Sequence, residues 1–358
     1  MAPERELHAL RHAAGLSRLD HVRPVRFRGD GAFDLVDALV SSRLFVRENE
    51  LIQTLLLDPD GRPFADAMVA QEEDALLLLA EGPSMEALLA HARRVKEERC
   101  PRAAVDVEDL SSTHGLYGLD GPYAWELASE ALGPDTLGLP YLSFVRLVDS
   151  VMCLRAGKTG EYGYLVLAPG PETEATWSRL REVGARQGAI EVGLPALDFC
   201  ALENWHFSMR LYEPMGRELQ LTPLEFQLQW RVDAQKDFVG APALKARRVA
   251  GPSGRVTCFT AGAEVSAGQP VRLGDARMGT VLVVGWSPFR REWVGWAHLD
   301  LSVAWPGISA LEVEGAGGPV AIDTRSPPLL NNRSLHIDPH RHSHQTRDQD
   351  EFPPLVVS

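Results

Sequence analysis

The sequence predicts an α+β fold followed by a small all-β domain. Strand and helix patterns alternate through most of the chain, with hairpin signals between neighbouring strands, which favours α+β over a doubly wound parallel sheet. Beyond about Arg248, glycine, proline and valine dominate and short strand patterns recur, as in a barrel or sandwich. Because 358 residues exceed one ordinary core, we expect two or three domains.

The first elements follow from apolar periodicity. Residues 4–16 carry leucine and alanine at helical spacing, which predicts an N-terminal helix. Residues 22–27 alternate apolar and basic side chains, as a half-buried strand does. Two glycines interrupt the pattern, and helical periodicity then returns over 33–40.

The next segment predicts a hairpin, a buried strand and a helix. Strands over 51–57 and 67–69 flank a turn that ends in Gly61, and glycine after aspartate is typical of hairpins because it adopts a positive φ without steric cost. The apolar run 76–80 predicts a buried strand. An amphipathic helix follows over 84–97, and its first residue is a capping serine.

A second cycle of strands and helices follows the first. We expect strands at 105–107, 114–119, 141–151 and 164–168, and helices at 122–131 and 172–187. In the glycine-rich part, strands are expected at 256–260, 280–285, 293–298 and 310–313. The expected domains are a body over 1–248, a β domain over 249–330, and a polar, histidine-rich tail over 331–358 that forms an arm or is partly disordered.

Charge and cysteine content limit the function classes. The chain has 49 acidic and 36 basic residues and a formal charge of -13, so we expect neither nucleic acid nor an anionic membrane as a partner. Its four cysteines lack the spacing of a disulfide framework or a zinc site. Residues 1–28 lack the apolar core of a signal peptide, and the run 75–80 is too short to span a bilayer. We therefore expect a cytoplasmic protein.

Six segments are informative through their order and spacing. They are residues 11–22, 60–69, 118–122, 155–164, 193–203 and 216–240. Residues 155–164 contain Thr-Gly-Glu before a tyrosine-bearing strand, and 216–240 combine Pro-Leu-Glu, Trp230 and a terminal Lys-Asp-Phe-Val-Gly. With these motifs, in this order and over most of its length, the chain resembles the glycine-cleavage T-protein (aminomethyltransferase) family.

The resemblance implies a folate-binding α+β body with Greek-key and ferredoxin-like parts, closed by a C-terminal β-barrel. It also implies tetrahydrofolate in a central channel. A family carboxylate beside the folate nitrogen that exchanges the carbon unit matches Asp66. One-carbon transfer through an amine passes a cationic, iminium-like centre, and a fixed carboxylate stabilises that charge or accepts a proton. The alternative is an aspartate at a strand end whose carboxylate is satisfied by backbone amides.

Further residues are assigned to the folate site through the same resemblance. Tyr141 matches a tyrosine that lines the family's pocket, and the alternative is an aromatic side chain packed in the core. Glu81 falls where the family has an asparagine beside the folate, and the alternative is a solvated glutamate at a strand end. We assign Gln53 and Trp230 to the same site, and we expect Arg333 to fold back toward the glutamate tail of the folate.

Several positions depart from the family pattern. Lys158 replaces a tyrosine and Leu165 a glutamate, while Leu197 and Ala201 replace two arginines. Leucine and alanine cannot form the charge-assisted bonds of a guanidinium or a carboxylate. We keep Lys158 and Leu197 in the folate channel. The departures disfavour the standard glycine-cleavage reaction on a lipoyl carrier and favour another donor or acceptor, such as an N-methyl or O-methyl compound.

The leading hypothesis is a one-carbon transferase that moves methyl or aminomethyl groups, of demethylase type or from a specialised pathway. Its cofactor is tetrahydrofolate, or the 5-methyl or 5,10-methylene form, and its partners are a small-molecule donor or acceptor and a protein of a multi-component system. One alternative is a non-catalytic folate-binding scaffold or assembly protein, but such relatives carry a cysteine-bearing element that residues 236–240 lack. Another is a pathway enzyme for a non-folate ligand. The tail histidines lack carboxylate or cysteine neighbours, so we expect no metal site.

Overall fold

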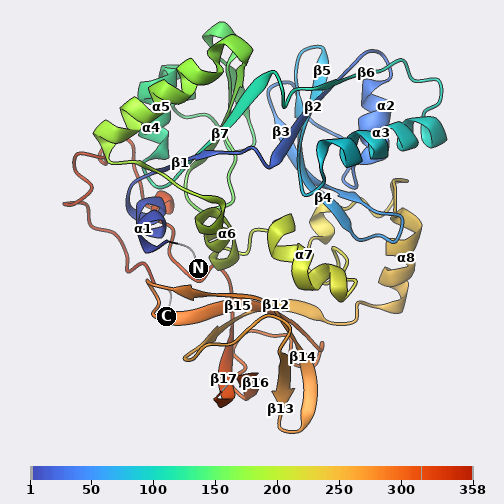
Figure 1. Cartoon of the computed structure of the whole chain (residues 1–358), viewed down its shortest axis with the longest axis vertical. Coiled ribbons are helices and arrows are strands. Elements are labelled where there is room, and N and C mark those ends of the chain that lie inside the picture. Colours follow the sequence, from blue (N-terminus) through green and yellow to red (C-terminus); the bar gives the residue numbers. More distant parts are fainter. Residues whose placement is uncertain (1–2, 316, 357–358) are drawn as a thin grey trace.

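A computed structural model describes residues 3–315 and 317–356. Two α/β layers stand side by side above a β-barrel, and helices α6 (Leu194–Glu203) and α7 (Met209–Glu218) lie between the layers and the barrel (Figure 1). Within the described residues, no helix combines the length and apolar character needed to cross a membrane.

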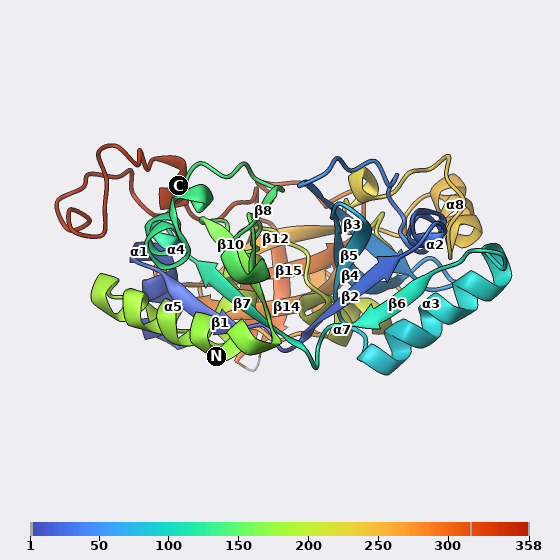
Figure 2. The same ribbon diagram turned by 90° about the horizontal axis from the view of Figure 1, so that it is seen from above.

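The first layer is a five-stranded antiparallel sheet in the order β3-β4-β5-β2-β6. Helices α2 (Ala32–Leu39) and α3 (Met85–Arg99) pack on one face of this sheet (Figure 2). The Ser84 hydroxyl accepts a hydrogen bond from the Ala87 N–H at 3.2 Å and so caps α3, as expected. The strands are β2 (Val22–Arg28), β3 (Leu51–Leu57), β4 (Pro63–Gln71), β5 (Ala75–Glu81) and β6 (Asp106–Asp109).

The second layer is a six-stranded sheet in the order β11-β1-β7-β10-β9-β8. Helices α4 (Ala124–Leu132) and α5 (Thr173–Gln187) pack on its outer face, and α1 (Glu4–His12) precedes its first strand (Figures 1 and 2). The strands are β1 (Gly15–Arg18), β7 (His114–Asp120), β8 (Phe144–Arg146), β9 (Met152–Leu154), β10 (Gly163–Pro169) and β11 (Ile190–Glu191).

Strand β5 shows how the two layers share a core. Successive side chains of a strand point to opposite faces of its sheet. Leu76 and Leu78 pack with α2 and α3 in one apolar cluster, whereas Leu77 and Leu79 pack with Leu165 and other residues of the second sheet in another. Both faces of β5 are therefore covered, which explains why its sequence is a continuous apolar run rather than an alternating one.

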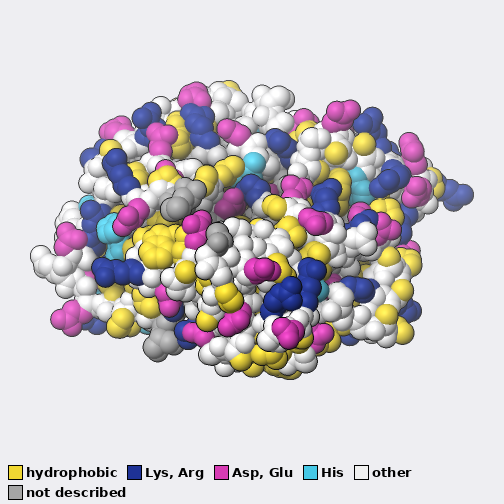
Figure 3. Space-filling model, turned by 60° about the horizontal axis from the view of Figure 1, so that its bottom comes forward, with side chains coloured by type: hydrophobic (Ala, Val, Ile, Leu, Met, Phe, Trp, Pro, Cys, Tyr) yellow, Lys and Arg dark blue, Asp and Glu magenta, His cyan; other side chains and the backbone are white. Residues whose placement is uncertain are grey.

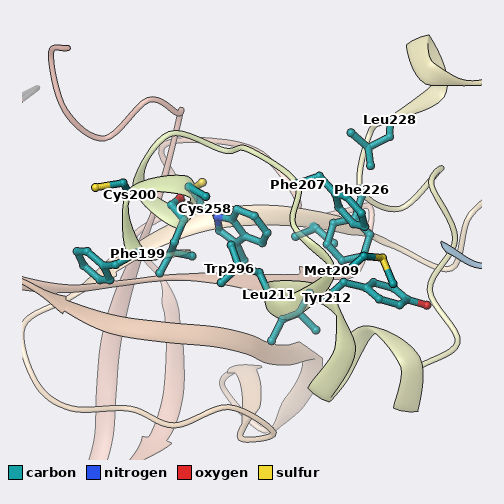
Figure 4. Close-up of a cluster of buried hydrophobic side chains, with 14 of the residues drawn as sticks. Phe199, Cys200, Phe207, Met209, Leu211, Tyr212, Phe226, Leu228, Cys258 and Trp296 are labelled. Atoms are coloured by element: carbon teal, nitrogen blue, oxygen red, sulfur yellow. Dashed lines mark hydrogen bonds between the residues drawn. The ribbon is translucent and has the colours of Figure 1, made fainter. Parts of the chain in front are cut away.

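Helices α6 and α7 connect the body to the barrel through a large aromatic cluster (Figure 4). Trp296 of the barrel is buried in it, and its indole N–H donates to the Leu202 carbonyl of α6 at 3.1 Å. The Trp296 ring lies 6.4 Å from Phe226, which meets Phe207 edge to face at 5.3 Å. Helix α8 (Ala241–Ala250) leads from this region into the barrel.

The C-terminal part is a closed six-stranded barrel in the order β12-β15-β14-β13-β16-β17. Acidic and basic side chains are interspersed over the face of the molecule that Figure 3 presents. The barrel strands are β12 (Arg255–Ala261), β13 (Pro270–Leu273), β14 (Ala276–Ser287), β15 (Glu292–Leu299), β16 (Leu311–Gly315) and β17 (Gly318–Arg325).

The predicted α+β body with a C-terminal barrel is confirmed, with differences in detail. The helix expected over 4–16 ends at His12, and residues 15–18 form β1 instead. The elements that were not predicted are α6, α7, α8, β1, β9, β11, β13 and β17. The expected strand 141–151 is limited to β8, because Asp149 and Ser150 turn the chain with φ of 59° and 61°. The expected boundary after residue 248 falls in the last turn of α8.

The tail beyond residue 330 packs against the body instead of extending as an arm. Asn332 is buried, and its amide donates to Asn204 at 2.7 Å. Ser334 donates its hydroxyl to Glu161 at 2.5 Å, and the Asp350 carboxylate accepts a hydrogen bond from the Tyr123 hydroxyl at 3.0 Å. Polar composition suggested an arm, but here the polar groups bind polar groups of the body.

Candidate functional site

A partly open hollow with a cavity volume of about 90 Å³ lies where the two sheets and α6 meet. Strands β4 and β5 form one wall, the loop between β9 and β10 forms another, and α6 contributes a third. Its apolar lining includes Leu19, Val22, Met68, Leu79, Leu165 and Leu197. Its polar lining consists of His21, Gln53, Asp66, Glu81, Asp120, Lys158, Thr159, Asp198, Arg210 and Arg231.

Two buried carboxylates face each other across neighbouring strands. Asp66 on β4 is paired in register with Glu81 at the end of β5, and their side chains are 5% and 6% exposed. Like charges directly opposite each other in a sheet are destabilising. A cation is therefore needed between them. Because Glu81 is buried, the alternative of a solvated glutamate at a strand end does not hold.

Lys158 supplies that cation. Its Nζ lies 2.6 Å from Asp66 Oδ2 and 2.7 Å from Glu81 Oε2, so one ammonium bridges both carboxylates. Lys158 sits in the glycine-rich loop between β9 and β10, where Gly160 has φ +81°. At Gly157 an added Cβ would lie 2.9 Å from Asp120 Oδ1. Glycine at these two positions thus permits the turn and the close approach that bring Lys158 into the hollow.

Two arginines complete the network. Arg231 donates to Asp66 Oδ1 at 2.6 Å, and both side chains are 5% exposed. Arg210 binds Asp198 with Nε and Nη2, at 2.8 and 2.7 Å from its oxygens, and places Nη1 3.3 Å from Glu81. The hydroxyl of Ser208 also donates to Glu81 Oε1, at 2.9 Å. Asp66 is therefore held by side-chain cations and not by backbone amides.

These contacts keep the site ionised. Burial alone raises the pKa of Glu81, but Lys158 and Arg210 outweigh burial and lower that pKa to about 2. Burial alone lowers the pKa of Lys158, but Asp66 and Glu81 raise it above its ordinary value. Lys158 is consequently an ammonium at neutral pH, a hydrogen-bond donor rather than a nucleophile.

Two further lining residues are neutral or titrate near neutral pH. Burial raises the pKa of Asp120 to about 7, against the opposing effects of the Thr159 hydroxyl and Arg155. Thr159 donates to Asp120 Oδ1 at 3.0 Å. Burial and then Arg210 lower the pKa of His21 to about 4, so its imidazole is neutral at pH 7. The hollow thus contains one acid that exchanges a proton in the physiological range.

The structure brings most of the proposed site residues together. Gln53, Asp66, Glu81, Lys158 and Leu197 all line the hollow. Gln53 also accepts a hydrogen bond from Arg231 at 3.3 Å.

The two aromatic candidates lie at the edge of the hollow instead. Tyr141 is 54% exposed and its hydroxyl accepts a hydrogen bond from Gln53 Nε2 at 3.1 Å, so it is not a core residue. Trp230 is 63% exposed, with its ring 4.8 Å from the Arg231 guanidinium. Each aromatic side chain contacts a lining residue but is not itself among the lining residues.

Arg333 lies elsewhere. Its guanidinium stacks on Phe352 at 5.1 Å, and the residue borders a separate hollow beside α1 and the tail, together with Arg5 and Arg347. The tail is anchored to Glu161 through the backbone N–H groups of Arg333 and Ser334, which directs Arg333 away from the central hollow. The structure does not bring Arg333 to the other proposed site residues.

Sequence reasoning missed six polar residues that line the hollow: His21, Asp120, Thr159, Asp198, Arg210 and Arg231. His21, Asp120, Thr159 and Asp198 lie within segments that carried the family resemblance. Arg231 directly follows Trp230, so that motif was the available signal. For Arg210 the sequence offers no signal, because its partners come from distant segments.

Comparisons with known proteins agree with the fold. Residues 1–236 match the family model described as the GCVT N-terminal domain. An aminomethyltransferase of Frankia alni is 31% identical over 331 residues, covering 88% of this chain and 86% of the relative. One of Synechococcus sp. is 28% identical and covers 89% of each chain. The crystal structure of the glycine cleavage system aminomethyltransferase T from Bartonella henselae is similar with a TM-score of 0.79, at 20% identity, covering 92% of this chain and 89% of that one.

Proposed function

Because this chain belongs to the glycine-cleavage T-protein (aminomethyltransferase) family, we propose that it is a tetrahydrofolate-dependent one-carbon transferase. We propose further that its carbon donor or acceptor is not that of standard glycine cleavage, and that the enzyme is of demethylase type or serves a specialised pathway. The observation that carries this proposal is the position of Asp66, a buried carboxylate fixed in the wall of the central hollow by Lys158 and Arg231.

The hollow has the composition that a pterin requires. Ligand pockets combine apolar walls with a few oriented polar groups. Met68, Leu79 and Leu165 provide apolar walls, and Gln53 offers an amide. Arg210 Nη1 is a buried donor that lies 3.3 Å from Glu81 without the geometry of a hydrogen bond. These side chains would hold tetrahydrofolate, which when bound supplies the nitrogen that carries the one-carbon unit.

Lining residues that depart from the family pattern support a one-carbon donor different from that of glycine cleavage. Leu165 and Leu197 are lining residues at positions where the family pattern has a glutamate and an arginine. Lys158 adds an ammonium where that pattern has a tyrosine, and it binds both Asp66 and Glu81. The charges that recognise a substrate are therefore arranged differently, while Asp66 itself is retained.

A second candidate is a folate-binding protein without transferase activity. The observation that favours it is the pairing of Asp66 with two cations, Lys158 and Arg231, because these ion pairs give the carboxylate a structural role that needs no substrate. Turnover distinguishes the two candidates, since both bind folate.

Folate binding is tested by thermal unfolding with tetrahydrofolate and its 5-methyl and 5-formyl forms. A ligand at one hundred times its dissociation constant stabilises a protein by about 2.7 kcal/mol, so the melting temperature should rise measurably. p-Aminobenzoylglutamate, which lacks the pterin, serves as the control and should give a much smaller shift. The absence of a shift with all three folates would contradict the proposed cofactor. Methyl transfer to tetrahydrofolate from a panel of methylated amines and ethers then separates enzyme from scaffold.

A further inference from the structure

We propose that the central hollow selects a one-carbon donor that is uncharged at the methyl-bearing atom and presents oxygen acceptors, such as a methyl ether with a carboxylate. This inference rests on the proposed function and names the substrate class of the same site. It follows from one relationship, in which Lys158 occupies the cation position between Asp66 and Glu81.

The register of β4 and β5 creates that cation position. Asp66 and Glu81 are cross-strand partners whose carboxylates open into the hollow. Two buried carboxylates so close together attract any cation that reaches them, including the ammonium of an amine substrate. Without Lys158, the wall would be a receptor for positively charged donors.

Lys158 fills this position with a group that cannot diffuse away. Its Nζ is within 2.7 Å of both carboxylates, and its attachment to the chain gives it a high effective concentration there. The remaining oxygens are also engaged, because Asp66 Oδ1 accepts from Arg231 and Glu81 Oε1 accepts from Ser208. Both oxygens of Asp198, a third carboxylate of the lining, bind Arg210. In these three carboxylates, an incoming ammonium finds no oxygen without a donor.

Displacing Lys158 is unfavourable. A substrate ammonium that took its place would leave the Lys158 ammonium without its two counterions inside a partly buried hollow. An unpaired charge at such a site carries a large desolvation penalty. The network therefore disfavours positively charged methyl donors, because the Lys158 ammonium repels them.

The hollow also contains N–H groups that are free to bind a substrate, and these favour a substrate with hydrogen-bond acceptors. An ammonium carries three N–H donors, and the two carboxylates account for two of those of Lys158. Arg231 Nε is a buried atom without a hydrogen-bond acceptor among the described residues, and Arg210 Nη1 lies 3.3 Å from Glu81 without the geometry of a hydrogen bond. Buried donors are nearly always satisfied in a functional complex. Ether, carbonyl or carboxylate oxygens of a bound one-carbon substrate would accept hydrogen bonds from these N–H groups.

The test uses two probes of nearly equal shape. Sarcosine and methoxyacetate carry the same methyl and carboxylate groups, and they differ in a cationic NH₂ against an ether oxygen. Calorimetric titration of both into the wild-type protein, with saturating tetrahydrofolate, should show methoxyacetate binding at least ten-fold tighter. Equal or tighter binding of sarcosine, or no binding of methoxyacetate, would overturn the proposal.

Variants connect the preference to Lys158. Lys158→Met keeps most of the volume and frees two carboxylates, so the preference should reverse in favour of sarcosine. Lys158→Met combined with Glu81→Gln leaves Asp66 with Arg231, which protects folding, and the preference should then disappear. Lys245→Met, an exposed lysine of α8, is the matched control and should behave as the wild type. An unchanged preference in both Lys158 variants would overturn the proposal.

Folate binding is measured on the same samples by thermal shift. A missing folate shift contradicts the proposed function, and the two probes are then titrated without folate. The preference for methoxyacetate is expected under that condition too, because the Lys158 network belongs to the protein alone. The two failures are thus distinguishable.

Discussion

The guanidinium of Arg11 lies 2.9 Å from the carboxylate of Glu203, and both side chains are completely buried. Arg11 also donates to the Thr159 carbonyl at 2.7 Å and to Asn332 at 3.3 Å. Through one side chain, α1 is therefore joined to α6, to the tail and to the loop that carries Lys158. Burial raises the pKa of Glu203 even though Arg11 opposes the shift, so the ion pair carries a desolvation cost that only a complete set of partners offsets.

Arg11→Met should strongly destabilise the protein, because Glu203 would keep its charge or take up a proton without its principal partner. Breaking a buried pair from one side costs about 3–5 kcal/mol in the free energy of unfolding. Urea denaturation of the variant and the wild type measures the loss. Arg5→Met, at an exposed position of the same helix, is the control and should stay within about 0.5 kcal/mol. Similar losses of unfolding free energy in both variants would show that the ion pair between Arg11 and Glu203 does not contribute specifically to stability.

Asp120→Asn should change how stability depends on pH. The folded pKa of Asp120 is about 7 against an ordinary 3.8, so between these values the folded protein binds one proton more than the unfolded chain. The contribution of Asp120 to stability is thus fully present below about pH 4 and is lost as pH rises toward 7, by about 1.4 kcal/mol per pH unit. Asparagine does not titrate, so the variant should become more stable relative to the wild type as pH rises.

The measurement is urea unfolding of both proteins at several values between pH 4 and pH 8. Subtracting the two curves removes the contribution of other groups, such as His21, whose pKa of about 4 gives the opposite slope. If the free energies of unfolding of the wild type and Asp120→Asn followed pH in parallel, the raised pKa of Asp120 would be contradicted.

In the proposed mechanism Asp66 is a preorganised charge beside the carbon being transferred, so Asp66→Asn should reduce turnover by about a hundred-fold or more. Folate affinity should fall far less, since this charge matters mainly in the transition state. Lys158 keeps its bond to Glu81 and Arg231 keeps its bond to Gln53, so the fold has remaining partners for both cations. Turnover with an active donor and folate titration separate the two effects.

The control for this prediction is Asp60→Asn, in the exposed turn before β4, which should leave turnover unchanged. Near-normal turnover in Asp66→Asn would refute a catalytic role. A loss of folding, with folate affinity unaffected in the folded fraction, would identify Asp66 as a structural residue instead.

Ser334→Ala tests the docking of the tail. The Ser334 hydroxyl donates to Glu161 Oε2 at 2.5 Å and accepts a hydrogen bond from the Tyr162 N–H at 2.8 Å. Removing it leaves buried polar groups short of a partner, which costs about 1–3 kcal/mol. The melting temperature should fall accordingly, whereas Ser302→Ala, in an exposed turn where Ser302 binds only Asp300, should have little effect. A melting temperature equal to that of the wild type would show that the tail adds no stability.

The elements that were predicted correctly owe their form to local chemistry. The apolar run of β5 and the serine cap of α3 are determined by residues next to one another in the chain. Helix α6 was missed because Ala196, Phe199, Cys200 and Ala201 are buried around much of its circumference, so no polar face marks its period. Helix α7 was missed because Pro214 interrupts its pattern.

Some residues of the candidate site could be found from sequence motifs, whereas others are recognised only from contacts between distant segments. Asp66 and Lys158 were found through segments whose order matches a family pattern. Arg210 and Arg231 were not found, because an arginine that binds a buried carboxylate looks in sequence like any surface arginine. Arg231 and Asp66 are separated by 165 residues, and only the fold brings them within 2.6 Å. The sequence thus identified the carboxylate but not the two arginines of its network.

The bond between Arg11 and Asn332 also has a consequence for synthesis on the ribosome. The two residues are 321 positions apart. At about 5–20 residues per second, Asn332 is made roughly half a minute after Arg11. During that interval α1 and α6 can already meet, but the guanidinium lacks one of its final acceptors. The docking of the segment that carries Asn332 therefore completes the hydrogen bonds of Arg11 only after both sheets of the body have been made.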